Sequence, residues 1–570
     1  MPVSFRPQAI IALCGLALLA IILWTGSGAY SSVPASQSGE TYVEAMVGAP
    51  RYINPLLAAS DSDKDLTHLI FSGLTRVDEH GEIVPDLASG WEVSPNGQVY
   101  TFTLKPGLRW HDGQPLTADD VLFTLRLLQA PDFPGDSTLA QPWRTVAIDA
   151  PTRQTLRLTL PAPNAAFLQH TTLGILPSHL WSSVKVSEMQ LSDLNLYPTG
   201  AGPWRNVARR PTLSDAPGLG EDLPGTPVPG SVPLSEGMIL EPNPYHVPTA
   251  QRNVSRIWFR LYPTFGAALT GFRMGEAHGL GHIPVDSLAE VQGIEGVTLH
   301  KQALARYSML ILNARSPLLD RVETRQALYL AIDRQAIASD SAIDGTSAHG
   351  PVLPQSWAYD PTLPLHGYNP QEAQRLLDSA GWAASGPGGL RVRDGVTLTL
   401  VLAANQDVPA NVVVAQKIEG YLRQVGVDVK LALVSRDRLL RDYLGPRSYH
   451  MALASWEAQG ADPDVFQYWH SSQANVEGGL NFSGWANPQA DEALQAARLT
   501  SDKAARKGHY ATFQKVFQQE IPAVVLYTPR YTYATRPPAQ GVTLPTTEML
   551  DPSYRFDTLR YWSIQLLRIP

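Results

Sequence analysis

The chain has a single cysteine, Cys14, which lies inside an apolar N-terminal segment, so the folded part contains no thiol. That part can form no disulfide and no thiolate metal cluster, and its rigidity must come from packing. A chain of 570 residues is longer than one hydrophobic core usually supports, which predicts two or more lobes. Because 44% of the residues are hydrophobic and 17% are charged, we expect a folded protein, neither disordered nor a multi-span membrane protein.

The charge balance argues against nucleic acid as a partner. Lys and Arg total 44 against 52 for Asp and Glu, which gives a formal net charge of -8. Such a chain has no basic field to attract phosphate backbones. We therefore expect no nucleic-acid partner, and we expect a monomer.

An apolar run over residues 9–24 precedes a Ser- and Gly-rich stretch over residues 25–39. This order is typical of an export signal. The run has 16 residues, slightly fewer than the roughly 17 to 25 that span a bilayer core. Two alternatives stay open: a signal cleaved after the small residues Ser27 and Ala29, or an uncleaved membrane anchor. Lipid attachment is disfavoured because Cys14 lies early in the run. Both alternatives predict an extracytoplasmic protein.

Strand and helix signals are mixed along the chain. Residues 100–104 alternate aromatic or aliphatic side chains with hydroxyl side chains, which is typical of a strand with one buried face. A Pro- and Gly-rich stretch over residues 211–240 has no periodicity and predicts an exposed loop. We expect further strands over residues 41–47, 155–160, 309–312, 397–402 and 427–434.

Helix starts are marked by capping residues. Thr117 precedes two acidic residues that favour the first turn of a helix, and Asn369 and Asn487 each precede a proline at the first helical position. Glu372 is expected to complete the cap of Asn369 reciprocally. A helix over residues 412–425 between two strands indicates an α/β lobe.

Many short motifs over residues 41–561 occur in the same order as in one known protein family. Together they resemble family 5 of the bacterial solute-binding proteins, the peptide- and nickel-binding components of ABC importers. The motifs are Ile70-Phe71-Ser72-Gly73-Leu74-Thr75-Arg76, Pro85-Asp86-Leu87-Ala88, Trp91-Glu92-Val93, Trp110-His111-Asp112-Gly113, Leu116-Thr117-Ala118-Asp119-Asp120-Val121, Thr199-Gly200-Ala201-Gly202-Pro203-Trp204, Asn243-Pro244-Tyr245, Ala331-Ile332-Asp333-Arg334, Leu422-Arg423-Gln424-Val425-Gly426-Val427, Met451-Ala452-Leu453-Ala454-Ser455-Trp456 and Asp462-Pro463-Asp464.

The resemblance implies an α/β protein with a two-lobed, type II periplasmic-binding-protein-like fold and an additional α+β domain, preceded by the export or anchor helix. Hinges are expected where the chain crosses between lobes, near residues 302–308 and 521–527. The implied domains are a signal or anchor with its linker over residues 1–40, lobe I over 41–75, 185–305 and 525–570, the extra domain over 76–184, and lobe II over 306–524.

The implied function is the capture of a peptide or peptide-like solute in a cleft that closes between the lobes. The solute would be delivered to the transmembrane permease subunits of an ABC importer and, through them, to its ATPase subunits. The protein would lie in the periplasm or on the outer face of the cytoplasmic membrane, where an uncleaved N-terminal segment would anchor it, and would need no cofactor.

Trp456 is either the aromatic floor of this cleft or part of the core. In many members of the family an Asp three residues after this tryptophan binds the amino terminus of a peptide, whereas this chain has Gln459. A neutral amide supplies no counter-charge to an ammonium group. This departure favours blocked peptides, opines, sugars or other uncharged solutes over free-amine dipeptides.

Five further residues are candidates for the cleft. Asn54 and Asn313 would present their amides to the ligand backbone or cap their own turns. Tyr307 and Trp204 are aromatic candidates, and Asp462 would either replace the missing acid or form a turn with the following proline.

Rival functions have weaker support. His278, His282 and Glu276 fall within seven residues, and this spacing could suit a metal ion. Gly279 and Gly281 interrupt any helix that would place both histidines on one face, so we expect no metal site. The sequence holds no nucleophile elbow, zinc-protease helix or phosphate-binding loop, and we expect no catalytic residues. A nickel or metal-chelate binding protein and a ligand-binding sensor stay open as alternatives.

Overall fold

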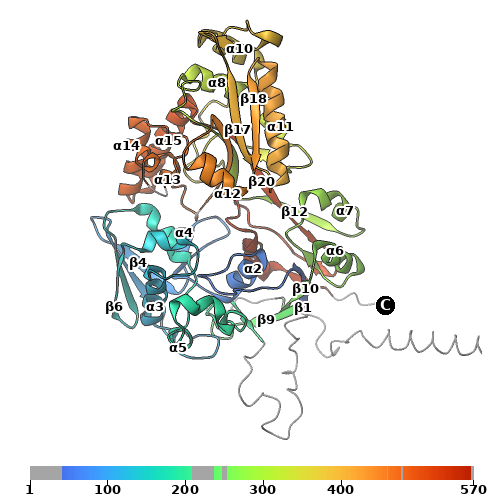
Figure 1. Ribbon diagram of the computed structural model, residues 1–570. Coiled ribbons are helices and arrows are strands. Elements are labelled where there is room, and N and C mark those ends of the chain that lie inside the picture. Colours follow the sequence, from blue (N-terminus) through green and yellow to red (C-terminus); the bar gives the residue numbers. More distant parts are fainter. Residues whose placement is uncertain (1–40, 208–236, 247–252, 459, 477–478, 566–570) are drawn as a thin grey trace, which may run out of the picture.

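Figure 1 shows two lobes beside a smaller domain in the computed structural model, which describes residues 41–207, 237–246, 253–458, 460–476 and 479–565. One twelve-stranded sheet passes through both lobes in the order β18-β17-β19-β13-β20-β11-β1-β10-β9-β8, and β12 and β14 also pair with β20. We call the β18 side of β20 lobe II and the β1 side lobe I. The predicted export segment and most of the loop predicted over 211–240 lie outside the described residues.

Lobe I is organised by β1, whose seven residues all pair in parallel with β10. Five successive residues of β1 are buried, as expected for a strand covered on both faces, and the strand predicted over residues 41–47 is confirmed. The elements of lobe I are β1 (Thr41–Val47), α2 (Asp61–Ile70), β8 (Trp204–Asn206), β9 (Gly237–Pro242), β10 (Arg256–Tyr262), α6 (Phe265–Met274), β11 (Gly279–Leu280), α7 (Leu288–Gln292), β12 (Thr298–Ala303), β21 (Ala539–Gln540), η11 (Pro552–Tyr561) and β22 (Ser563–Ile564).

Lobe II contains the parallel pair β17 and β18, joined by α11. Val414, Ile418 and Leu422 recur every four residues on the buried face of α11, which begins at Pro409 rather than at the predicted residue 412. Separate buried clusters cover the two faces of the sheet. The elements of lobe II are β13 (Arg306–Leu312), α8 (Val322–Ala331), α9 (Arg334–Ala338), β14 (Gly345–Ser347), α10 (Pro370–Ser379), β15 (Val392–Arg393), β16 (Val396–Thr397), β17 (Thr399–Asn405), α11 (Pro409–Gln424), β18 (Asp428–Val434), α12 (Arg436–Arg438), β19 (Met451–Glu457), α13 (Phe466–Trp469), α14 (Pro488–Leu499) and α15 (Lys503–Glu520), with β20 (Ala523–Thr535) shared between the lobes.

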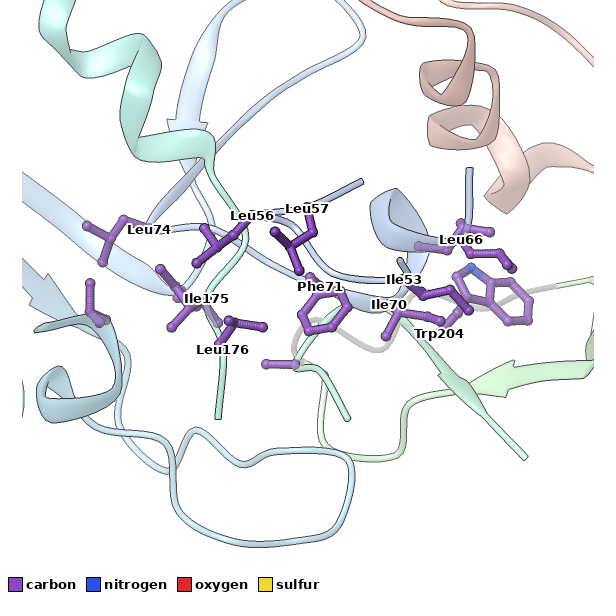
Figure 2. Packing of buried hydrophobic residues seen from close by; sticks show 14 of the residues in the cluster. Ile53, Leu56, Leu57, Leu66, Ile70, Phe71, Leu74, Ile175, Leu176 and Trp204 are labelled. Carbon is purple, nitrogen blue, oxygen red and sulfur yellow. The ribbon is translucent and has the colours of Figure 1, made fainter. Parts of the chain in front are cut away.

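The smaller domain has an antiparallel sheet of order β4-β5-β7-β6, with α3 packed against it. Its core is continuous with that of lobe I, and Figure 2 shows Leu74 and Ile175 in one row with Phe71, Ile70 and Trp204. Because the two share one core, we expect them to move as one body. The elements are β2 (Thr75–Val77), β3 (Ile83–Pro85), β4 (Ala88–Val93), β5 (Val99–Leu104), α3 (Ala118–Gln129), α4 (Ser137–Ala140), β6 (Ala147–Thr152), β7 (Thr155–Thr159) and α5 (Ser178–Trp181).

The predicted helix starts are confirmed at all three capping residues. The side chains of Thr117, Asn369 and Asn487 each accept a backbone N–H of the first turn. The prediction that Glu372 completes the cap of Asn369 is wrong, because the Glu372 carboxylate pairs with Arg375 in the same helix. Neighbouring charges of opposite sign on the helix surface compete for this side chain.

The chain crosses between the lobes at two strands. β12 leads into β13 through residues 304–305, and β20 runs through both lobes. Within β20, residues 523–527 pair with β13 and residues 530–535 pair with β12. Residues 527–529 also pair with β14 of lobe II, so the second crossing lies at residues 529–530, shortly after the segment predicted as a hinge, 521–527.

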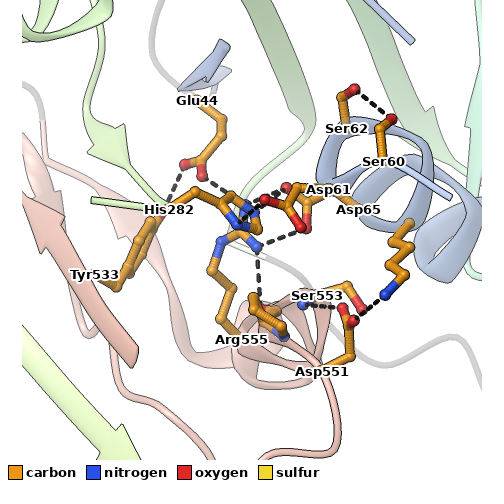
Figure 3. Close-up of polar contacts among 12 residues, drawn as sticks. Glu44, Ser60, Asp61, Ser62, Asp65, His282, Tyr533, Asp551, Ser553 and Arg555 are labelled. Atoms are coloured by element: carbon orange, nitrogen blue, oxygen red, sulfur yellow. Dashed lines mark hydrogen bonds and ion pairs between the residues drawn. The ribbon is translucent and has the colours of Figure 1, made fainter. Parts of the chain in front are cut away.

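Arg555, on η11, belongs to a buried ionic cluster inside lobe I (Figure 3). Its guanidinium donates to Glu44 at 2.9 Å and to the two carboxylate oxygens of Asp65 at 2.6 and 2.7 Å. The Tyr533 hydroxyl donates to the other oxygen of Glu44 at 2.5 Å. The three charged side chains are at most 4% exposed, so they compensate one another away from water. One arginine thus joins η11 to β1, α2 and β20.

His282 extends this cluster along α2. Its ring nitrogens lie 3.2 Å from Asp65 and 3.0 Å from Asp61. Burial alone would lower the pKa of His282, but the Asp65 charge and the hydrogen bonds to both carboxylates raise that pKa to about 9. His282 is therefore charged at neutral pH and supports Arg555 in balancing the surrounding carboxylates.

Replacement of Arg555 by Met should lower the free energy of unfolding by about 3–5 kcal/mol, because it leaves buried carboxylates without a counter-charge. Urea denaturation followed by circular dichroism measures this change. The matched control is Arg560→Met on the same helix, whose ion pair with Glu79 at 2.8 Å is partly exposed. This control should barely move the unfolding midpoint. Equal effects of the two substitutions would contradict the role assigned to Arg555.

Candidate binding cleft between the lobes

A hollow of about 170 Å³ lies between the lobes, where the turn joining β2 to β3 faces the end of β19. We call it the interlobe cleft. Lobe I, the β2–β3 hairpin and lobe II all contribute to its wall. The lining residues are Val77, Asp78, His80, Gly81, Glu82, Ala305, Pro351, Val352, Leu353, Gln355, Ser356, Trp357, Trp456, Ala458, Gly460, Ala461, Asp462, Pro463, Pro545, Thr547, Glu548, Met549, Leu550 and Tyr554.

Two larger hollows adjoin the interlobe cleft. One of about 250 Å³, between the smaller domain and lobe II, shares Glu82, Trp357 and Asp462 with it. The other, of about 540 Å³, extends into lobe I beside α2 and shares Val77 and Tyr554 with it. Small-molecule sites commonly occupy roughly 300–1,000 Å³. The hollows together therefore offer enough room for a solute of that size.

Trp456 forms part of the lobe II wall. It lies on β19 directly opposite Tyr307 on β13, and the two rings are stacked with centroids 4.9 Å apart. Tyr468 meets the indole edge-on at 6.0 Å. The Trp456 side chain lines the cleft but is only 4% exposed, and its indole Nε1 has no hydrogen-bond partner among the described residues. The tryptophan is thus both packed in the core of lobe II and part of the cleft wall, with Tyr307 buried behind it.

Asp462 lines the cleft, but its charge is compensated within lobe II. Its two oxygens each lie 2.7 Å from the guanidinium of Arg506 on α15. Burial raises the pKa of Asp462, and the arginine opposes that effect. The structure therefore gives this carboxylate a structural partner, and the turn role predicted for it is not its principal contact.

Asn54 and Asn313 are buried turn-capping residues and do not line the interlobe cleft. Asn54 accepts the Leu56 N–H and donates to Asn195. Asn313 accepts the Arg315 N–H and donates to backbone carbonyls. Of the two roles predicted for these amides, the structure favours capping, because a short side chain after a strand reaches the adjacent N–H groups first.

Trp204 and Gln459 complete the predicted set. Trp204, on β8, is buried in the lobe I core and lines the 540 Å³ hollow, not the interlobe cleft itself. Gln459 lies outside the described residues, so its role in the cleft stays a prediction.

Glu548 is a cleft residue that sequence reasoning missed. It follows β20 in a segment without regular structure and belongs to no motif. Its carboxylate accepts a hydrogen bond from the Gln355 backbone, and burial raises the pKa of Glu548 to about 7. Only the arrangement in space, which brings the chain back to the hinge, identifies this residue.

The three residues considered as metal ligands have separate contacts. His278 accepts the Val43 N–H, and His282 pairs with acidic residues of α2. Glu276 pairs with Arg260 at 3.2 Å. Within the described part of the chain, no group of three His, Cys, Asp or Glu side chains is placed to hold a metal ion. The same residues include no helix long and apolar enough to cross a membrane.

Sequence comparison gives one family match and several relatives. The model of bacterial extracellular solute-binding proteins, family 5, matches residues 82–478. Oligopeptide-binding protein AppA of Bacillus subtilis is 24% identical over 92% of this chain and 94% of its own. The probable D,D-dipeptide-binding periplasmic protein DdpA of Escherichia coli is 25% identical over 98% and 99%. Both relatives are named as binding proteins.

Solved structures share the fold. NikZ from Campylobacter jejuni in complex with Ni(L-His) matches with a TM-score of 0.68 and 25% identity, over 92% of this chain and 99% of its own. HbpA2 from Haemophilus parasuis matches with a TM-score of 0.75 and 21% identity, over 92% and 100%. The two lobes, the extra domain and the cleft between them define a type II extracytoplasmic solute-binding protein. The chain belongs to family 5 of the bacterial extracellular solute-binding proteins.

Replacement of Glu548 by Gln should change how stability depends on pH. The folded state raises the pKa of this carboxyl from 4.5 to about 7, so between these values the folded protein binds more protons than the unfolded chain. The free energy of unfolding of the wild type therefore falls as the pH rises from 4.5 to about 7. Glu548→Gln removes that loss and should be more stable than the wild type at pH 8 by on the order of 2 kcal/mol, with little difference at pH 4.5.

Urea denaturation of both proteins at a series of pH values measures the difference. Glu188→Gln, which changes a carboxylate exposed at 51%, serves as the control and should run parallel to the wild type. A constant offset between Glu548→Gln and the wild type across this range would contradict the burial of a raised-pKa carboxyl in the cleft.

Proposed function

We propose that the chain is the substrate-binding component of an ABC importer and captures a peptide or peptide-like solute in the interlobe cleft. The observation that carries this proposal is a hollow lined by both lobes beside the first crossing, in a member of a solute-binding family. The relatives named for oligopeptide and D,D-dipeptide binding support a peptide-like solute. In this proposal lobe I comprises 41–75, 185–305 and 530–570, the extra domain 76–184 and lobe II 306–529, with the predicted boundary at 524–525 moved to the crossing within β20.

Capture would proceed by hinge closure. The smaller domain shares a core with lobe I, so these two parts form one jaw and lobe II forms the other. Glu82, on the β2–β3 turn, pairs with Lys503 at the start of α15 at 2.7 Å, which bridges the jaws beside the cleft. A peptide would bind with its backbone extended against the end of β19. The aromatic wall around Trp456 would contact its side chains.

The partners follow from this role. The closed form would dock on the transmembrane permease subunits of the importer and, through them, act with its ATPase subunits. The protein would be a non-enzymatic monomer in the periplasm or on the outer face of the cytoplasmic membrane. The N-terminal segment would serve as its export signal or anchor.

A second candidate solute is a metal chelate, which the match to NikZ with Ni(L-His) favours. The chelating molecule would then supply the metal ligands, and the cleft would recognise that molecule. Native mass spectrometry of the protein purified from its own host distinguishes the candidates, since a chelate adds the mass of both metal and chelator.

Small-angle X-ray scattering tests closure. Saturation with short synthetic peptides should lower the radius of gyration, because the jaws approach each other around the ligand. Trp456→Ala should show less compaction at the same peptide concentration, with the wild-type radius in the absence of peptide. An unchanged radius for a wild-type protein that calorimetry shows to be saturated would contradict hinge closure.

A further inference from the structure

We propose that Glu548 binds a positively charged group of the solute, so that the interlobe cleft selects solutes bearing an ammonium or guanidinium group. The inference rests on the proposed function and assigns it a specificity-determining residue. It replaces the uncharged solute that Gln459 alone suggested.

The backbone around Glu548 is fixed against the first crossing between the lobes. The Met549 N–H donates to the Ala303 carbonyl at 3.0 Å, and the Ala305 N–H donates to the Met549 carbonyl at 2.8 Å. One residue before Glu548, the Thr547 carbonyl accepts from the Gln302 side chain at 2.5 Å. These contacts flank Glu548 on both sides. Hydrogen bonds therefore fix the backbone that carries Glu548, and this residue lines the cleft.

Glu548 differs from the other acids of the cleft because no cation neutralises it. Glu82 pairs with Lys503, and Asp462 pairs with Arg506. Across the residues that the structure describes, Glu548 has no Lys, Arg or His within ion-pair distance, and one backbone N–H is its hydrogen-bond donor. A partly desolvated carboxylate without a counter-ion is unfavourable, which is why burial raises its pKa to about 7. A cationic solute would supply the missing charge.

None of the remaining charged residues that line the cleft supplies a counter-charge to Glu548. Asp78 accepts the His80 and Glu82 N–H groups of its own turn. The His80 ring is 69% exposed and lies nearest to Glu79, at 3.9 Å. The lining therefore contains four carboxylates and one histidine, and both of its neutralised acids use partners on α15. Charge complementarity favours a cation in this cleft.

The aromatic wall beside Glu548 is compatible with a cationic group. Trp456 lines the same cleft, and the face of an indole ring attracts a nearby cation. The ammonium group of a free peptide amino terminus is one such cation.

Calorimetric titration with one peptide in free and N-acetylated forms tests this assignment. The wild type should bind the free form about tenfold or more tightly than the acetylated form, because only the former carries an ammonium group. Glu548→Gln should weaken binding of the free form by the same factor and leave the acetylated form unchanged. Glu188→Gln, the exposed control, should behave as the wild type.

The pH dependence gives a second readout. Between pH 5.5 and 7 the wild-type affinity for the free peptide should rise by up to about tenfold per pH unit, as Glu548 ionises, and Glu548→Gln should lose this dependence. An equal loss for both peptide forms, or identical pH profiles, would overturn the role of Glu548 while the proposed function stands. A wild type that binds neither form at any pH would overturn the proposed function, and this inference with it.

Discussion

The buried ionic cluster around Arg555 is the interaction on which the rest of this structure depends. Among the described residues, the arginine comes from the last helical segment, whereas Glu44 lies in the first strand, 511 residues earlier. An arginine with two carboxylates in a site closed to water is stable only when all its partners are present. The cluster therefore holds the two ends of the described chain together across lobe I.

The position of the cleft wall depends on this joining of the two ends of the described chain. Tyr554, the neighbour of Arg555, lines the cleft, and Glu548 lies a few residues earlier on a segment bonded to the first crossing. The same jaw includes the smaller domain, because one apolar core runs through both. The cleft thus lies between two bodies that are each internally packed and are joined by two strands. This architecture confines large motion to the crossings.

Local signals in the sequence predicted local structure well. The limits of β1 and the capping roles of Thr117 and Asn487 depend on neighbours within a few residues, and the structure confirms them. Family motifs predicted the two-lobed fold, which the comparisons bear out. The predicted start of α11 was a few residues too late. The predicted second crossing was a few residues too early, because β20 continues as one strand through both lobes.

The cleft was less predictable. Asn54 was equally compatible with a ligand contact and a turn cap until its burial was known. Glu548 and Arg555 carry no motif, and their roles arise from contacts with residues hundreds of positions away, which a single sequence does not pair.

Hydrogen–deuterium exchange of the protein with and without a bound free-amine peptide tests the central claim, that the solute binds between the lobes. The account predicts slower exchange at the facing walls, in residues 77–82, 351–357 and 545–550, and at the crossing over 528–530. Protection confined to a single lobe away from these segments, or none at saturation, would contradict it.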